Sequence, residues 1–292
     1  MSSRPLIFGE VLFDRFPDGR AVLGGAPFNV ARHLAAFGQA PRLVSRVGDD
    51  DLGRQVLAVM DELGMDRTAV GIDDQLATGT VEVTFEDGEP RYEITRPVAW
   101  DAIAIPPDVD DAALLYHGSL AQRADASRDT LRQLRDGFAG RVFVDVNLRD
   151  PWWTRETLDD ALAHADWAKL NEEELVLLGG DGDAPLTSRA AAFASHHELE
   201  GLLVTRGADG AMAVEAGGRV TLSEPPPPVT VVDTVGAGDG FASVFLLGNL
   251  QDWPVSLTLE RALAFAAAIC TLRGGTPTDP GFYTPFLTAW TD

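Results

Sequence analysis

The chain contains the segment Asp233-Thr234-Val235-Gly236-Ala237-Gly238-Asp239-Gly240, which follows an apolar run at residues 229–232 and opens a second apolar run. The first run is expected to be a strand and the second a helix. Small residues let the main chain approach an anion closely, and the first turn of a helix offers unpaired N–H groups and the positive end of its dipole. The N–H groups of Gly236, Ala237 and Gly238 are therefore predicted to bind a phosphate without a lysine.

Asp239 lies in the first turn of the expected helix, beside that phosphate. A carboxylate in this place can accept the proton of an attacking hydroxyl, as the catalytic aspartate does in phosphoryl transfer. A plainer interpretation is a glycine-rich turn followed by an acid that stabilises a helix start, because short glycine motifs recur by chance.

A second glycine segment, Gly24-Gly25-Ala26-Pro27-Phe28-Asn29, opens another expected helix near the N-terminus. Close main-chain approach and the Asn29 amide, which both donates and accepts, suit a polyhydroxylated ligand. Asp14, upstream of this segment, can accept hydrogen bonds from two sugar hydroxyls. Taken alone, Asp14 is equally consistent with a turn aspartate before Pro17-Asp18-Gly19.

Composition narrows the class of protein. The 292 residues, 45% of them hydrophobic, are ordinary for a globular chain with one large or two small domains. The 45 acidic residues outnumber the 23 basic ones, which argues against nucleic acid as a partner. No apolar run approaches the roughly 20 residues of a membrane span, and the first residues do not read as a signal peptide. No membrane partner and a cytoplasmic location are therefore expected.

Residue types that often carry chemistry are scarce. Cys270 is the only cysteine, so an intrachain disulfide or a cysteine zinc site is excluded. Lys169 is the only lysine, and we interpret it as part of a surface charge bias. The histidines show no spacing typical of metal ligands and are expected to be packing or surface residues.

The apolar pattern alternates between expected strands and helices. Strands are predicted near residues 6–12, 42–47, 114–117, 142–146, 167–170 and 202–205, with helical patterns between them. This rhythm predicts an α/β fold with a mainly parallel sheet. Alternating apolar residues at 81–94 predict a hairpin which, with residues 13–22, would form a small sheet that projects from the body.

The two glycine segments together resemble the signatures of the PfkB (ribokinase-like) carbohydrate kinases. Gly24-Gly25 through Asn29 to Gly38 resembles the N-terminal signature of that family, and residues 233–239 resemble the C-terminal one. The similarity extends over essentially the whole chain, including residues 145–149, 171–174 and 205–207. It implies one ribokinase-like domain over residues 1–292, a three-layer α/β/α sandwich with a mainly parallel central sheet and a small β-sheet lid from about residues 13–22 and 78–98.

The resemblance also implies a role for each matched residue. Asp239 would be the base, and Gly236, Ala237 and Gly238 the anion hole. Sugar would be bound by Asp14, Gly24, Gly25, Asn29 and Arg149, and ATP by Asn171, Thr205, Gly207 and Gly238. Glu174 would hold Mg²⁺ through water, which suits an ion that keeps several waters. Asp233 and the Val235 carbonyl lie where the family often binds a monovalent cation, which leaves K⁺ open.

Similarity to bacterial fructokinase-like members favours fructose as the substrate, phosphorylated to fructose 6-phosphate. Ribose and a nucleoside remain open as substrates, and arginines such as Arg149 leave room for an acidic sugar, 2-keto-3-deoxygluconate. A catalytically silent sugar or nucleotide binder is a further alternative. The chain has no G-x-G-x-x-G after its first strand and no G-x-x-x-x-G-K-[ST] loop, which argues against a dinucleotide oxidoreductase and a Walker-type kinase. The edge of the small sheet makes a homodimer plausible.

Overall fold

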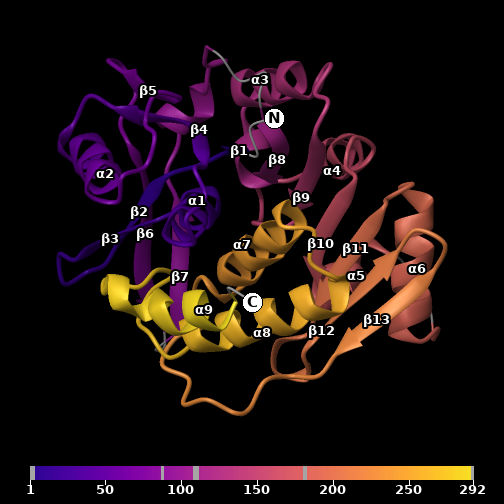
Figure 1. Ribbon diagram of the computed structural model, residues 1–292. Helices are drawn as coiled ribbons and strands as arrows, with labels where there is room; N and C mark the ends of the chain where they lie inside the picture. Colours follow the sequence, from indigo (N-terminus) through magenta and orange to yellow (C-terminus); the bar gives the residue numbers. More distant parts are fainter. Residues whose placement is uncertain (1–3, 87–88, 108–111, 180–182, 291–292) are drawn as a thin grey trace.

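A computed structural model describes residues 4–86, 89–107, 112–179 and 183–290 of the chain (Figure 1). Its strands are β1 Arg4–Phe8, β2 Leu12–Arg15, β3 Ala21–Gly24, β4 Arg42–Gly48, β5 Val70–Asp73, β6 Gly79–Glu86, β7 Glu89–Ile94, β8 Ala112–Gly118, β9 Arg141–Asp145, β10 Trp167–Asn171, β11 Gly201–Thr205, β12 Ala211–Glu215 and β13 Arg219–Ser223. Its α-helices are α1 Ala26–Ala36, α2 Asp51–Glu62, α3 Asp125–Arg135, α4 Arg155–Leu162, α5 Glu172–Leu178, α6 Leu186–His196, α7 Ala237–Leu250, α8 Val255–Ile269 and α9 Thr284–Ala289. Short 3₁₀ turns are η1 Ala99–Ala102, η2 Leu120–Arg123, η3 Gly207–Asp209 and η4 Pro280–Tyr283.

Nine strands form a large sheet in the order β13-β12-β11-β10-β9-β8-β1-β4-β5. The strands from β11 to β5 in this order pair in parallel, and β12 and β13 pair antiparallel at one edge. The expected α/β fold with a mainly parallel sheet is thus confirmed. Because the strands run in parallel, their carboxyl ends meet along one edge, where open α/β sheets bind ligands.

Helices cover both faces of the large sheet, which makes three layers. Alternate side chains of each strand point to opposite faces, so neighbouring residues enter different cores. Ile7 and Leu43 pack with α1, α2, α7 and α8, whereas Val144 and Val204 pack with α4, α5 and α6. A third cluster places η1 and α3 against β1 and β8. Figure 1 shows α7 and α8 lying together over the middle of the molecule.

A separate small sheet of four strands has the order β3-β2-β6-β7. The expected hairpin is confirmed as the antiparallel pair β6 and β7, and β2 joins it in parallel. Residues 6–12, predicted as one strand, divide instead into β1 and β2, because the chain leaves the large sheet after Phe8 and enters the small sheet at Leu12. The connection between them therefore links the two sheets directly.

The strand predicted at residues 229–232 is wrong. These residues lie outside every strand, and Val231 and Val232 are 58% and 56% exposed. The Val232 N–H donates to the Cys270 carbonyl at the end of α8, at 2.8 Å. An apolar run can be held against a helix end as well as in a sheet, and periodicity does not separate these cases.

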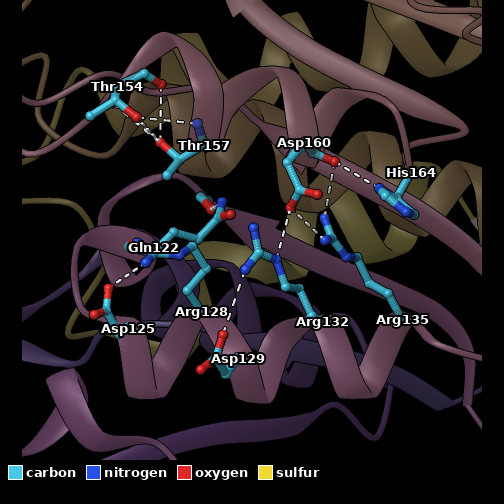
Figure 2. A network of polar contacts seen from close by, with 11 residues as sticks. Gln122, Asp125, Arg128, Asp129, Arg132, Arg135, Thr154, Thr157, Asp160 and His164 are labelled. Carbon is cyan, nitrogen blue, oxygen red and sulfur yellow. Dashed lines mark hydrogen bonds and ion pairs between the residues drawn. The ribbon is translucent and has the colours of Figure 1, made fainter.

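Polar contacts fix α3 against α4 and η2, on the face of the large sheet opposite α1, α7 and α8 (Figure 2). Asp160 of α4 accepts from Arg132 and Arg135 of α3, at 3.3 and 2.8 Å. Arg128 of α3 donates to the Gln122 carbonyl in η2, at 3.0 Å. The backbone of η2, which follows the carboxyl end of β8, is thereby tied to a packed helix.

No helix in the described part of the chain is long and apolar enough to cross a membrane.

Candidate active site

The structure brings the two glycine segments together. Asp239 lies in the first turn of α7, and its Oδ2 accepts a hydrogen bond from Asn29 Nδ2 of α1 at 2.7 Å. Asn29 is 5% exposed, and a side chain held this firmly has one orientation. Asn29 therefore orients the Asp239 carboxylate, although 210 positions separate the two residues.

Gly236 begins α7 in a conformation that requires glycine. It has φ 78°, in the left-handed region, and a Cβ at this position would lie 2.2 Å from Cα of Gly275. The loop before Gly275 therefore packs directly on the turn. Gly238 is different, since the nearest atom to a Cβ there is Lys169 Nζ at 3.6 Å. Gly238 leaves open space where the segment was predicted to hold a phosphate.

The Asp239 carboxyl has a raised pKa of about 6. Burial is the main cause; the Asn29 hydrogen bond lowers the pKa, the charge of Asp145 raises it, and Lys169 and Arg149 lower it. The carboxylate remains mostly ionised at neutral pH, with a proton affinity close to that pH. These are the properties of an efficient general base.

The interpretation of Lys169 as a surface residue is wrong. Lys169 is 6% exposed, and its Nζ lies 2.8 and 3.0 Å from the two carboxylate oxygens of Asp145. Tyr116 donates to the same carboxylate at 3.2 Å. The available signal was a lone basic residue in the apolar strand that ends at Asn171. The pair places an ammonium group beneath the Gly238 turn.

The residues predicted to bind sugar lie on and beside the small sheet. Asp14 is in β2, and a Cβ at Gly24 would come 3.8 Å from its Oδ2. Burial raises the pKa of Asp14 to about 6, against the lowering effect of Arg149. Gly25 precedes α1 with φ 103°, and a Cβ there would meet the Glu10 carbonyl at 2.7 Å.

Arg149 follows β9 and is exposed. Within the described residues its guanidinium forms no ion pair, and Nη1 donates to the Leu148 carbonyl at 3.1 Å. Its charge nonetheless lowers the pKa values of Asp14, Glu10 and Asp239. Arg149 therefore acts electrostatically on all three carboxyl groups.

The residues predicted to bind nucleotide lie at the ends of β10 and β11. Asn171 pairs with Thr205 across these strands, and Gly207 begins the turn that follows β11. Asn171 and Glu174 also cap α5: Asn171 Oδ1 accepts from the Glu174 N–H, and Glu174 Oε2 accepts from the Asn171 N–H, both at 2.8 Å. This capping box gives both residues a structural role that the sequence analysis did not assign.

Glu174 retains acceptor capacity for a hydrated cation. Its Oε1 accepts from the Leu148 N–H at 2.7 Å, and each carboxylate oxygen has a second lone pair. No group of three or more His, Cys, Asp or Glu side chains in the described ranges is arranged to hold a metal ion. Mg²⁺ is commonly bound by one or two carboxylates, water and substrate phosphates, so this donor set fits it.

Asp233 joins two loops beside the start of α7. One carboxylate oxygen accepts from the Val235 N–H and the other from the Gly274 N–H, both at 3.1 Å. The loop before Gly275 therefore lies next to Asp233 and Val235, as the expected cation site requires. The carboxylate and neighbouring carbonyls are the oxygen donors that a hard cation takes.

Comparisons with known proteins show the family to which the chain belongs. Residues 8–280 match the family model described as pfkB family carbohydrate kinase. A fructokinase of Klebsiella pneumoniae is 34% identical over 95% of this chain and 96% of its own length. A fructokinase of Xylella fastidiosa solved with bound ATP has a TM-score of 0.84 at 23% identity over 94% of each chain. A fructokinase of Vibrio cholerae O395, solved with fructose, ADP and calcium ion, has a TM-score of 0.81 at 25% identity, covering 97% of this chain and 98% of that one.

Proposed function

The chain belongs to the pfkB family of carbohydrate kinases, and on this premise we propose that it transfers the terminal phosphoryl group of ATP to fructose, giving fructose 6-phosphate. As a family member it is a phosphotransferase with an alcohol group as acceptor. The proposal adds the identity of the sugar and the roles of individual residues.

One observation carries the proposal: Asp239, oriented by Asn29 at 2.7 Å, lies at the start of α7 beside the open Gly238 turn. The carboxylate accepts the proton of the sugar hydroxymethyl group. The freed oxygen forms a bond to the terminal phosphorus of ATP, and the bond from that phosphorus to the bridging oxygen breaks, so that ADP leaves with the electron pair. A silent binding protein would not need an oriented, partly buried base.

The negative charge that develops on the transferred group needs stabilisation within this acidic chain. Main-chain N–H groups at residues 236–238 and the dipole of α7 would supply it, and the Ala237 N–H also donates to the Thr234 carbonyl at 3.2 Å. Lys169 adds a positive charge, which the Asp145 carboxylate, 2.8 Å from Nζ, partly neutralises. Such fixed donors act without reorganisation during the reaction.

Mg²⁺ and K⁺ complete the proposal. Glu174, through water, and Asn171, at a nucleotide phosphate, would lie beside Mg²⁺, which neutralises phosphate charge when it is bound. Asp233 and the Val235 carbonyl would hold K⁺, behind the turn that begins at Gly236. Thr205 and Gly207 would line the nucleotide at the ends of β10 and β11.

The small sheet is proposed to act as a lid over the sugar within a single domain. Asp14 and Gly24 lie on this sheet, whereas Asp239 belongs to α7 in the body. Closure would bring a sugar held by the small sheet up to Asp239. Exclusion of water matters because water competes as a phosphoryl acceptor.

The test is a coupled ADP-release assay with ATP and magnesium over fructose, ribose, adenosine and 2-keto-3-deoxygluconate. We expect the largest kcat/KM for fructose. A preference for adenosine or the sugar acid would replace the fructose assignment, and ADP release that no sugar stimulates would favour the silent binder. Repeating the assay with and without potassium tests the site at Asp233.

A further inference from the structure

Three buried polar side chains lie where two central strands end. Glu10 follows β1 by two residues, and Gln122 and Arg123 close η2, directly after β8. Strands β1 and β8 are neighbours in the sheet. Glu10 and Gln122 are each 4% exposed, and the Arg123 side chain is 3% exposed. Within the described residues Glu10 Oε2, Gln122 Oε1 and Arg123 Nη1 have no hydrogen-bond partner.

Arg123 is fixed so that only one of its nitrogens is left over. Its Nε and Nη2 donate to the two carboxylate oxygens of Asp101 at 2.8 and 2.9 Å, and Nη2 also donates to the Thr95 carbonyl. The guanidinium lies 3.9 Å from the ring centre of Trp100 and 4.8 Å from that of Trp152. A guanidinium held by an acid and two aromatic rings cannot turn its Nη1 elsewhere.

Glu10 shares the surroundings of Arg123. Burial raises the pKa of Glu10 to about 7, and the charges of Asp239, Arg149 and Arg123 also act on its carboxyl. A Cβ on Gly79 would lie 2.2 Å from Trp100 Nε1 and 3.1 Å from the carbonyl of Val11, so the indole beside Arg123 and the residue after Glu10 flank one glycine.

One contact orients the side chain of Gln122, and another holds its backbone. Nε2 donates to the Gly118 carbonyl at the end of β8, at 3.0 Å, and the main-chain carbonyl of Gln122 accepts from Arg128 of α3. The amide orientation leaves Oε1 as the unused atom. Buried polar atoms without a partner are costly, and their persistence at strand ends is typical of a ligand site.

We propose that Glu10, Gln122 and Arg123 bind hydroxyl groups at the inner end of the sugar and restrict the site to neutral polyols. This inference rests on the proposed sugar kinase function. A sugar hydroxyl can donate to Glu10 Oε2 or Gln122 Oε1 and can also accept from Arg123 Nη1. Two neighbouring hydroxyls of the sugar would therefore give all three atoms a hydrogen-bond partner.

Charge makes the same atoms unsuited to a sugar acid. The cation of Arg123 is already neutralised by Asp101, and Glu10 and Asp239 are acidic groups close enough for the charge of one to act on the other. A substrate carboxylate at the inner end would meet the acidic Glu10 and the already paired Arg123. Arg149 is exposed, and its charge also acts on Glu10.

The experiment compares Glu10→Gln with wild type, using fructose as the probe. Glutamine keeps the shape but replaces the carboxyl, which is partly ionised at neutral pH, by an uncharged amide. Glu62→Gln, exposed at the end of α2, is the matched control. We expect the KM for fructose to rise at least tenfold in Glu10→Gln, with the KM for ATP within twofold of wild type. The ratio of kcat/KM for fructose to that for 2-keto-3-deoxygluconate should fall. Gln122→Ala removes another of the three proposed sugar contacts without changing charge. This variant should raise the fructose KM and leave the ratio of the two kcat/KM values unchanged.

Unchanged fructose KM values in both variants, with wild-type activity on fructose, would overturn this inference and leave the proposed function intact. The inference is also overturned, with the proposed function left intact, if Glu10→Gln raises the KM for ATP as much as the KM for fructose. If the wild type phosphorylates no sugar, the proposed function fails and this inference fails with it. If Glu10→Gln does not fold, as circular dichroism would show, Gln122→Ala decides the question through the fructose KM alone.

Discussion

Replacement of Asp239 by asparagine separates catalysis from stability. Asparagine can still accept the hydrogen bond from Asn29, which joins α1 to α7, so the local structure should survive. The variant lacks the base, and kcat should fall by about 10²–10⁴-fold while the KM for ATP changes little.

The same substitution should stabilise the fold. The pKa of Asp239 is raised from 3.8 to about 6, so the folded state holds the proton more tightly than the unfolded state, and the ionised carboxylate costs free energy above pH 6. The free energy of unfolding of Asp239→Asn should therefore exceed that of wild type by about 2–3 kcal/mol at pH 8, since the wild-type carboxyl keeps some contact with solvent, and by about 1 kcal/mol at pH 4.5. Urea unfolding at both pH values measures it.

Asp252→Asn is the matched control, because Asp252 is exposed just beyond the far end of α7. Its unfolding free energy should change by less than about 0.5 kcal/mol, with normal kcat. A kcat within tenfold of wild type for Asp239→Asn would remove Asp239 as the base. An Asp239→Asn protein that is less stable than wild type at pH 8 would refute the argument from the buried charge.

Three further predictions concern proton binding and backbone space. The pH profile of kcat/KM should fall about tenfold per unit below pH 6, as the base becomes protonated; a profile flat down to pH 4.5 would contradict this assignment. Gly238→Val should fold normally but lose phosphoryl transfer, which kinetics measure. Gly236→Ala should lower Tm in a thermal melt, because its Cβ would lie 2.2 Å from Cα of Gly275. Equal Tm values for Gly236→Ala and wild type would argue against the packed turn. The buried His117 has its pKa lowered to about 3 by burial, so stability falls by about 2 kcal/mol between pH 7 and pH 5, where the unfolded state binds a proton that the folded state does not. Urea unfolding should show a shallower acid decline in His117→Gln, and an unchanged slope would show that folding does not lower the pKa of His117.

The mainly parallel sheet and the glycine turn could be predicted because both depend on local properties. Alternating apolar residues such as Leu43 and Val44 enter opposite cores whatever lies above them. The need for glycine at Gly236 follows from the backbone conformation of one turn. A short motif beside a helical pattern was therefore sufficient to predict the position of Asp239.

Other features depend on distant parts of the chain. Lys169 looks like any surface lysine until β9 places Asp145 at 2.8 Å from it. Residues 229–232 look like a strand until the Cys270 carbonyl, directly after α8, accepts the Val232 N–H. Arg123 looks like any other arginine in the sequence until Asp101 and two indole rings give its remaining nitrogen a direction.

The alternation of strands and helices and the residue types of the glycine turn at 236–238 could thus be predicted from residue spacing, because periodicity and glycine conformation act over a few neighbouring positions. Which carboxylates lose solvent, which cation neutralises which acid and which polar atoms are left for a sugar were set by packing across the sheet. These are consequences of burial and distance between residues far apart in the chain, such as Asn29 and Asp239, and spacing along the chain does not encode them.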